Sequence, residues 1–217
     1  MLTIRRFVWF SYFESTVMAL STEQQRKVLD GAVELASSQD LSSITLDHLT
    51  RACGIRAFDI VRHYHSKEKI LAAVLERELE LIAGSVPSPD SRFPGETLRD
   101  ELEVIAKIML GEYRSRLPFL ARLLTEAMKN ADVGALFYST FIVQGRKLFA
   151  EFLNVRKRLG ELRETVDVEA SAAFYLSALT FILLVVELFG GKHVEPLDEE
   201  RLVRSMSDLF LNGVARS

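Results

Sequence analysis

The sequence contains little cysteine, and this excludes two classes of small protein. Its one cysteine, Cys53, cannot form an intrachain disulfide and offers no repeated Cys or Cys/His spacing for structural zinc. The four histidines indicate no metal site either, because His63 and His65 would point in different directions on a helix. We therefore expect no metal, no cofactor and a reducing, cytoplasmic setting.

Apolar runs of membrane length are also lacking. The longest apolar stretch, Ala172 to Val186, is shorter than the roughly 20 residues of a bilayer-spanning helix, so we expect a buried helix and no membrane partner. Two arginines and an aromatic cluster near the N-terminus imitate a signal peptide, but Ser11 and Glu14 interrupt the apolar run. Residues 1–20 are expected to form a poorly ordered arm. Met18 is an alternative start, so it stays open whether residues 1–17 belong to the natural protein.

Neither sign of charge dominates the chain of 217 residues, whose formal net charge is -3. Residues 21–79 hold eight Lys/Arg and nine Asp/Glu, so counterion release on binding a nucleic acid would be modest. This balance excludes a protein coated in positive charge. It does not exclude DNA binding, which requires only one local basic surface.

Proline is missing from the first 86 residues, so helices can run there without interruption. Apolar residues recur at helical spacing from residue 21; Thr45 can cap a short second helix, Gly54 permits a sharp turn before a third, and Ser66 can cap a fourth. Further helices are predicted over 96–116, 117–129, 132–159, 166–189 and 197–212. No segment alternates as a strand would, so the predicted fold class is all-α.

A Pro/Gly/Ser-rich segment at residues 85–95 predicts a domain boundary. Before it, residues 21–84 form the first expected domain, a three-helix helix-turn-helix unit followed by the fourth helix. The second helix of such a motif can lie in the major groove of DNA. After the boundary, residues 96–217 form a second helical domain.

Several motifs in residues 25–74 carry a family resemblance. Thr45 precedes the second helix, Ala-Cys-Gly-Ile at 52–55 forms the turn, and His-Tyr-His-Ser-Lys-Glu at 63–68 closes the motif. This pattern resembles the DNA-binding domain of tetracycline-repressor (TetR) type regulators, with their Thr-capped helix, Ala-x-Gly-Val turn and Ser-Lys-Glu ending. Residues 160–184 are similar, in outline, to the approach to the family's dimerisation helices. The positions that match or substitute conservatively are Thr45, Ala52, Gly54, Ile55, Ile60, His63, Tyr64, Ser66, Lys67 and Glu68.

The third helix departs from the family pattern. Where the family often has Ser-x-Gly-Thr-x-Tyr, this chain has Arg56, Phe58, Asp59 and Val61. The arginines could pair with phosphate or guanine, Phe58 and Val61 could touch thymine methyls, and Asp59 could accept from cytosine N4 while repelling phosphates. The residues expected to contact DNA are Thr45, Arg56, Ala57, Phe58, Asp59, Val61, Arg62, His63, Tyr64 and Lys67.

Each of these residues also has a simpler interpretation. Arg56 and Arg62 could be solvated surface charges, and Phe58 could pack against the first helix. Tyr64 is a core residue on either interpretation. Lys67, beside the capping Ser66, resembles a phosphate-binding helix start, but it could equally be an ordinary capped one.

The second domain is rich in aromatic residues and, by the family resemblance, is expected to sense a ligand. Tyr113, Phe119, Phe137, Phe141 and Phe174 are candidates to line a pocket for a small apolar effector, and Tyr138, Phe149 and Phe152 could also line it, although each could instead fill the core. The apolar stretch 172–189 and a stripe on the last helix together predict a symmetric four-helix homodimer interface. The expected interface residues are Phe181, Leu183, Leu184, Met206, Leu209 and Phe210.

Two functions therefore remain in competition. The first is a ligand-responsive transcription regulator, expected to be a repressor, that binds a near-palindromic double-stranded DNA operator as a homodimer. The alternative is a helical dimer of the same type that has lost sequence-specific DNA reading and binds protein. An enzyme is not expected, because the sequence shows no nucleophile with a base and no phosphate cradle.

Overall fold

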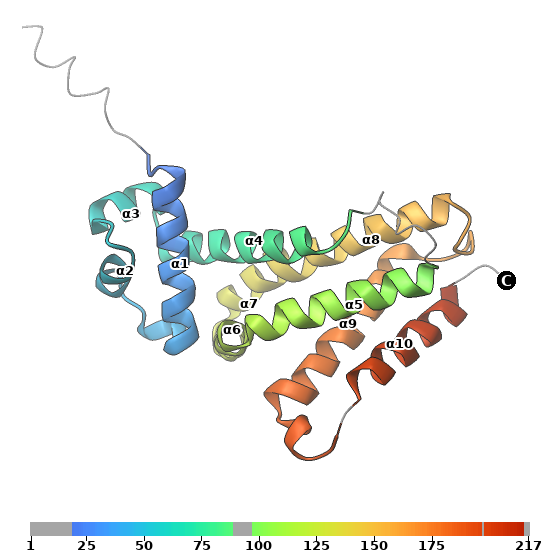
Figure 1. Ribbon diagram of the computed structural model, residues 1–217. Coiled ribbons are helices and arrows are strands. Elements are labelled where there is room, and N and C mark those ends of the chain that lie inside the picture. Colours follow the sequence, from blue (N-terminus) through green and yellow to red (C-terminus); the bar gives the residue numbers. More distant parts are fainter. Residues whose placement is uncertain (1–18, 89–96, 197, 215–217) are drawn as a thin grey trace, which may run out of the picture.

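The computed structural model describes residues 19–88, 97–196 and 198–214 (Figure 1). Within these ranges the chain forms helices joined by short turns and contains no strand, so the prediction of an all-α fold is confirmed. The α-helices are α1 (Thr22–Ser38), α2 (Leu46–Cys53), α3 (Ala57–Tyr64), α4 (Lys67–Ser85), α5 (Leu98–Ser115), α6 (Leu117–Lys129), α7 (Ala131–Phe137), α8 (Val143–Arg158), α9 (Val168–Leu183) and α10 (Glu199–Val214).

Side-chain caps define where the N-terminal helices begin. Ser21 and Gln24 form a capping box at α1, and Thr45 and His48 form one at α2, where the Thr45 hydroxyl accepts from the His48 amide at 3.2 Å. The hydroxyl of Ser66 accepts from the amide of Lys69 at the start of α4. The predicted caps at Thr45 and Ser66 are confirmed.

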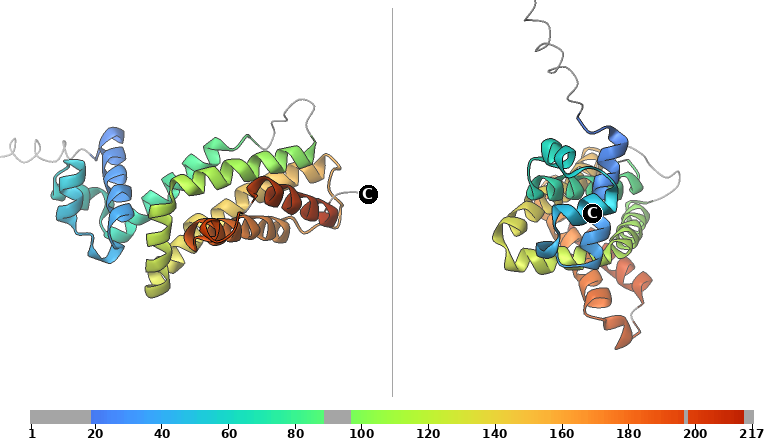
Figure 2. Two further views of the ribbon diagram at one scale, coloured as in Figure 1. Left: turned by 60° about the horizontal axis from the view of Figure 1, so that its bottom comes forward. Right: turned by 90° about the vertical axis from the view of Figure 1, so that its left-hand side faces the viewer.

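Helix α4 connects the two ends of the molecule. Helices α1, α2 and α3 gather at one end, and α4 leads from them along the C-terminal helices (Figures 1 and 2). The hydrophobic core around α1 to α4 also receives Phe119 and Leu123 from α6 and Phe141 from the π-turn after α7. The core therefore crosses the expected domain boundary at residues 85–95. Of the expected arm, only Ala19 and Leu20 are described, and Leu20 is buried in this core.

A second core joins α5, α8, α9 and α10. At its centre the Tyr175 hydroxyl donates to the carbonyl oxygen of Leu102 at 2.9 Å, and burial raises the pKa of this phenol. Arg156 and Glu101 form a buried ion pair at 2.9 Å, with the guanidinium also over the ring of Phe152. These contacts hold α5, α8 and α9 together.

Helix α9 continues through a π-turn (Leu184–Leu188), giving an apolar helix over Val168–Leu188 that is long enough, by length and composition alone, to cross a membrane. It packs instead against α5, α8 and α10. The expectation that this segment is buried is only partly right, since Tyr175 and Leu179 are buried and Phe174 and Phe181 are exposed.

Candidate nucleic-acid interface and effector cavity

A left-handed glycine positions the candidate recognition helix. Gly54 ends α2 with φ 70°, a conformation that L side chains rarely adopt, and this reverses the chain between α2 and α3. Arg56 is the N-cap of α3 and supplies no capping hydrogen bond from its side chain. Ile60 and Tyr64 anchor the inner face of α3 in the core. The predicted turn is confirmed, and it presents the opposite face of α3 to solvent.

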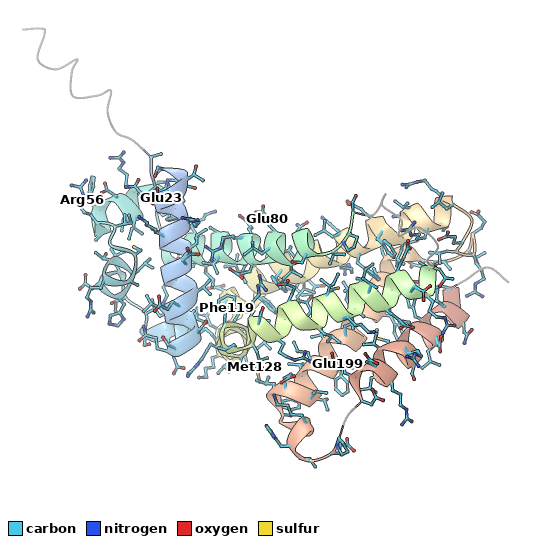
Figure 3. All side chains as sticks on the ribbon, in the orientation of Figure 1. Glu23, Arg56, Glu80, Phe119, Met128 and Glu199 are labelled. Carbon is cyan, nitrogen blue, oxygen red and sulfur yellow. The ribbon has the colours of Figure 1, made fainter. Side chains whose placement is uncertain are left out.

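That outer face combines exposed apolar side chains with arginines. Phe58 is 68% exposed and Val61 is 47% exposed, so Phe58 does not pack against α1. The guanidinium carbon of Arg62 lies 5.9 Å from the centre of the Phe58 ring, a cation–π arrangement. Arg56 lies at the outer end of the molecule, away from the C-terminal helices (Figure 3). Ala57 and His63 are half-buried on the flanks of this face.

The acidic residue of α3 is paired. The Nε of Arg56 donates to Oδ2 of Asp59 at 2.7 Å, and this hydrogen bond raises the pKa of Arg56. The Asp59 carboxylate is three-quarters buried, whereas the Arg56 side chain is largely exposed. Asp59 therefore presents less negative charge to an approaching polyanion than the sequence alone suggests.

Three of the expected DNA contacts have structural roles here. The Thr45 hydroxyl is occupied in the cap of α2, and Tyr64 is buried, which raises the pKa of its phenol. Lys67 also makes contacts within the chain. Its ammonium donates to the carbonyl oxygens of Leu41 and, at 3.2 Å, Ile44, in the turn that leads into α2.

An apolar cavity of about 150 Å³ lies between α4, α5 and α8. Of the five expected ligand residues only Tyr113 lines it, and burial raises the pKa of Tyr113 to about 12. Phe149 and Phe152, which the sequence also offers as pocket candidates, line it too. The prediction missed the large non-aromatic side chains of its wall, which are Leu79, Ile82, Val86, Ile105, Met109 and Leu148.

The other four expected ligand residues do not line this cavity. Phe137 and Phe141 stack at a centroid distance of 5.5 Å and belong to the core of α1 to α4, which also buries Phe119. Phe174 is 64% exposed on α9. The ring of Tyr113 lies 6.4 Å from that of Phe141, so Tyr113, Phe137 and Phe141 pack together. Only Tyr113 of the five also lines the cavity between α4, α5 and α8.

Helices α9 and α10 lie side by side (Figures 1 and 2) and expose a separate apolar surface. Phe181 is 65% exposed and Leu209 is 74% exposed, and Leu209 lines one groove together with Phe174. Leu184 and Met206 are partly buried beside this surface. Leu183 and Phe210, also expected at the interface, are buried in the core of the same chain, although Phe210 lines the same groove as Phe174 and Leu209.

Comparisons with known proteins agree with this architecture. No family model matches the chain. It is 26% identical over 113 residues to the HTH-type transcriptional repressor KstR of Rhodococcus jostii, a match that covers 52% of this chain and about half, 51%, of the relative. A protein of Mesorhizobium loti described as a TetR-family transcriptional regulator aligns with a TM-score of 0.71, at 14% identity, over 89% of this chain and 98% of that one. The flavonoid-responsive regulator FrrA aligns with a TM-score of 0.70, at 21% identity, over 90% of this chain and 98% of that one.

The TM-scores show that the fold is that of TetR-family regulators, and at identities this low they show the fold alone. The resemblance predicted from residues 25–74 is confirmed. The relatives are transcriptional regulators, a family that is not enzymatic, in agreement with the expectation that the chain is no enzyme.

Proposed function

We propose that this chain, which has the fold of TetR-family regulators, is a ligand-responsive transcriptional repressor that binds a near-palindromic DNA operator as a homodimer. One observation carries the DNA-binding part. The outer face of α3 is held away from the rest of the molecule by the Gly54 turn and combines Arg56 and Arg62 with the exposed Phe58 and Val61. Arginine reads guanine or phosphate, and apolar side chains contact thymine methyl groups.

Contacts to DNA are assigned to the exposed Arg56, Phe58 and Val61 and to the half-buried Ala57, Asp59, Arg62 and His63. The buried Tyr64, the capping Thr45 and Lys67, which donates to two main-chain carbonyl groups, support the helix and make no base contact. We expect the affinity for DNA to fall only modestly with salt concentration. Contacts of Lys and Arg to phosphate set this dependence, and residues 21–79 hold eight Lys/Arg against nine Asp/Glu.

Helix α4 is the proposed route from effector to DNA. Its first turn follows α3 directly, and its second half supplies Leu79, Ile82 and Ala83 to the cavity with Tyr113. An effector that favours one position of α4 changes the placement of α3, provided that it binds two conformations with different affinity. FrrA is named for a response to flavonoids. For this chain we propose a small apolar effector, because the cavity is lined mainly by apolar side chains.

The homodimer is assigned to the apolar surface of α9 and α10. Phe174 and Phe181 are seven residues apart, so they lie on one side of α9. Leu209, on α10, lines the same groove as Phe174. Two copies that pack these helices together about a twofold axis bury this surface and present two α3 helices to successive half-sites.

A specific observation also favours the alternative, a protein-binding module. Phe58 and Val61 leave an exposed apolar patch on α3, and Asp59 already pairs with Arg56. Selection of random DNA duplexes by the purified protein at low salt separates the two functions. Enrichment of one palindromic half-site supports the repressor, whereas no enriched sequence and elution from mixed DNA at low salt support the alternative.

A further inference from the structure

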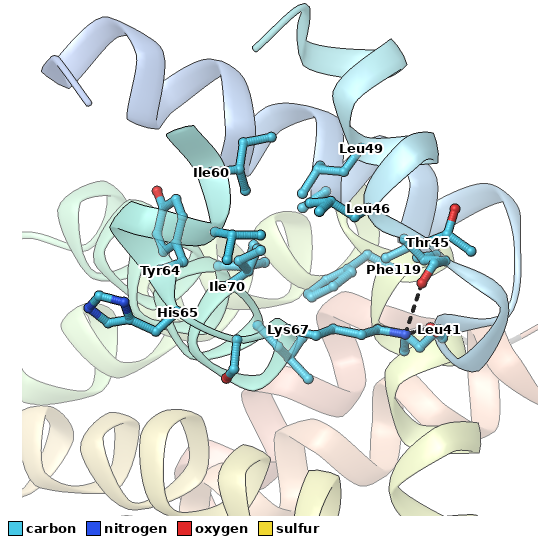
Figure 4. A pocket seen from close by; sticks show the side chains of 17 residues that line it. Leu41, Thr45, Leu46, Leu49, Ile60, Tyr64, His65, Lys67, Ile70 and Phe119 are labelled. Atoms are coloured by element: carbon cyan, nitrogen blue, oxygen red, sulfur yellow. Dashed lines mark hydrogen bonds between the residues drawn. The ribbon is translucent and has the colours of Figure 1, made fainter. Parts of the chain in front are cut away.

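A second and larger cavity lies inside the helix-turn-helix domain, apart from the cavity of Tyr113. Its volume is about 270 Å³, and α1, α2, α3 and α4 all contribute to its wall (Figure 4). Most of the lining is apolar, including Ala32, Leu49, Ile60 and Ile70. An apolar cavity of roughly 150 Å³ in a protein core is enough to bind benzene, so this one has room for a larger apolar group.

The cavity is closed from the C-terminal half of the molecule by Phe119. This side chain comes from the first turn of α6 and is almost completely buried among the N-terminal helices. It faces the cavity together with Ile60 and Tyr64 of α3 (Figure 4). A molecule in the cavity would therefore touch the candidate recognition helix and the C-terminal half at the same time.

The ammonium group of Lys67 lies at the edge of this apolar cavity. Lys67 is exposed as a residue, yet its side chain runs along the cavity and its ammonium donates to two main-chain carbonyl groups, those of Leu41 and Ile44 (Figure 4). Both acceptors are neutral, and among the described residues no carboxylate forms an ion pair with Lys67. A carboxylate forms a stronger, charge-assisted hydrogen bond with an ammonium than a neutral carbonyl does.

We propose that this cavity binds an apolar monocarboxylate. The carboxylate accepts from Nζ of Lys67 in place of the Leu41 and Ile44 carbonyls, and the hydrocarbon chain lies between Ile60 and Phe119. Lys67 at present ties the start of α4 to the turn that leads into α2. Its withdrawal loosens that turn, and the hydrocarbon presses on the inner face of α3. The bound protein should then have a lower affinity for its operator. Only this effect on DNA binding rests on the proposed function.

Calorimetric titration of octanoate into the full-length protein tests the site. Ala32→Leu fills the cavity from α1, Lys67→Met removes the ammonium and keeps most of the length, and Ala83→Leu is the matched control that fills the cavity of Tyr113 instead. We expect octanoate to bind the wild type and Ala83→Leu equally. Binding to Lys67→Met should be at least about tenfold weaker, as for loss of one charge-assisted hydrogen bond, and Ala32→Leu should not bind.

The neutral analogue octanamide tests the charge. It should bind the wild type about tenfold more weakly than octanoate does, and Lys67→Met should no longer distinguish the two. Where circular dichroism shows that Ala32→Leu is unfolded, Ile70→Phe fills the same cavity from α4.

Three results would overturn the proposal: no octanoate binding by the wild type, equal binding of octanamide, or binding lost in Ala83→Leu and kept in Ala32→Leu. Binding is measured without DNA. Octanoate bound at this cavity by a protein that selects no DNA sequence supports the site and discards only the proposed function.

Discussion

The Nε of Arg116, at the start of α6, lies 2.8 Å from Oε2 of Glu78, a buried carboxylate on α4. The other oxygen of Glu78 accepts from Arg77 at 2.9 Å, and Arg77 also pairs with Asp30 on α1 at 2.8 Å. Glu112 of α5 pairs with Arg116, and the hydroxyl of Ser85 donates to Glu112, which lowers the pKa of that carboxyl. One network of charges therefore connects α1, α4, α5 and α6 at the junction of the two halves.

Replacing Glu78 with Gln should destabilise the fold. The substitution leaves the partly buried Arg77 and Arg116 sharing fewer acceptors, and the loss of a charged hydrogen-bond partner at a buried site costs about 1–3 kcal/mol. Glu80→Gln is the control, because Glu80 is exposed on the same helix (Figure 3). Urea unfolding of both variants measures the difference. Equal stability of the two variants would show that Glu78 does not hold the junction together.

The turn between α3 and α4 yields a second prediction about stability. His65 is the one non-glycine residue with positive φ among the described residues, at 65°, a conformation that strains an L side chain. His65→Gly should therefore be neutral or stabilise the protein by up to about 1 kcal/mol. His63→Gly, inside α3, should destabilise it by about 1 kcal/mol. Urea unfolding measures both, and a larger loss for His65→Gly would contradict the strain.

Much of the helix-turn-helix was predictable because its signals are local. The Thr45 and Ser66 caps and the Gly54 turn act within a few residues of chain, so the sequence alone indicates them. The destination of Lys67 was not predictable, since its acceptors lie 26 and 23 residues away along the chain. Only the packing of α4 against the turn before α2 brings them together.

The ligand and dimer residues were less predictable for a different reason. Helix α9 is apolar nearly all round, so periodicity does not distinguish Leu183, which is buried, from Phe181, which is exposed. In the same way, the rotation of each helix decides which aromatic residues reach the cavity of Tyr113. Phe149 and Phe152 line it, whereas Phe119 faces the other half.

The position of Phe181 yields a prediction about assembly. Phe181→Glu places two carboxylates in a symmetric apolar interface and should give a monomer that remains folded. Met128→Glu is the control, because Met128 is an exposed apolar residue of α6, outside the proposed interface. Sedimentation velocity at micromolar concentration measures the difference. A wild-type protein that already sediments as a monomer would refute the interface, and Leu183→Glu should instead unfold the chain.

The arginines of α3 yield a prediction about DNA. Arg62→Ala should lower the salt slope of operator binding by about one unit if Arg62 contacts phosphate, or relax one base preference by about 1–3 kcal/mol if it contacts guanine. Arg56→Ala should act similarly. Arg204→Ala is the control, since Arg204 is exposed on α10. Fluorescence anisotropy at several salt concentrations measures the slope. Unchanged affinity and slope in both α3 variants would reject this helix as the reading element.

Asp59→Asn decides between the two proposed functions. The change removes the carboxylate that holds Arg56 at 2.7 Å, so it frees a guanidinium and deletes a negative charge that repels phosphate. Non-specific DNA affinity should rise while preference at one base pair weakens, because an amide no longer accepts from cytosine N4 as a carboxylate does. Asp47→Asn, at an exposed position of α2, is the matched control. Anisotropy on operator and scrambled duplexes measures both effects. A protein that binds only other proteins through α3 would show neither change, since its Arg56 would gain no phosphate to contact.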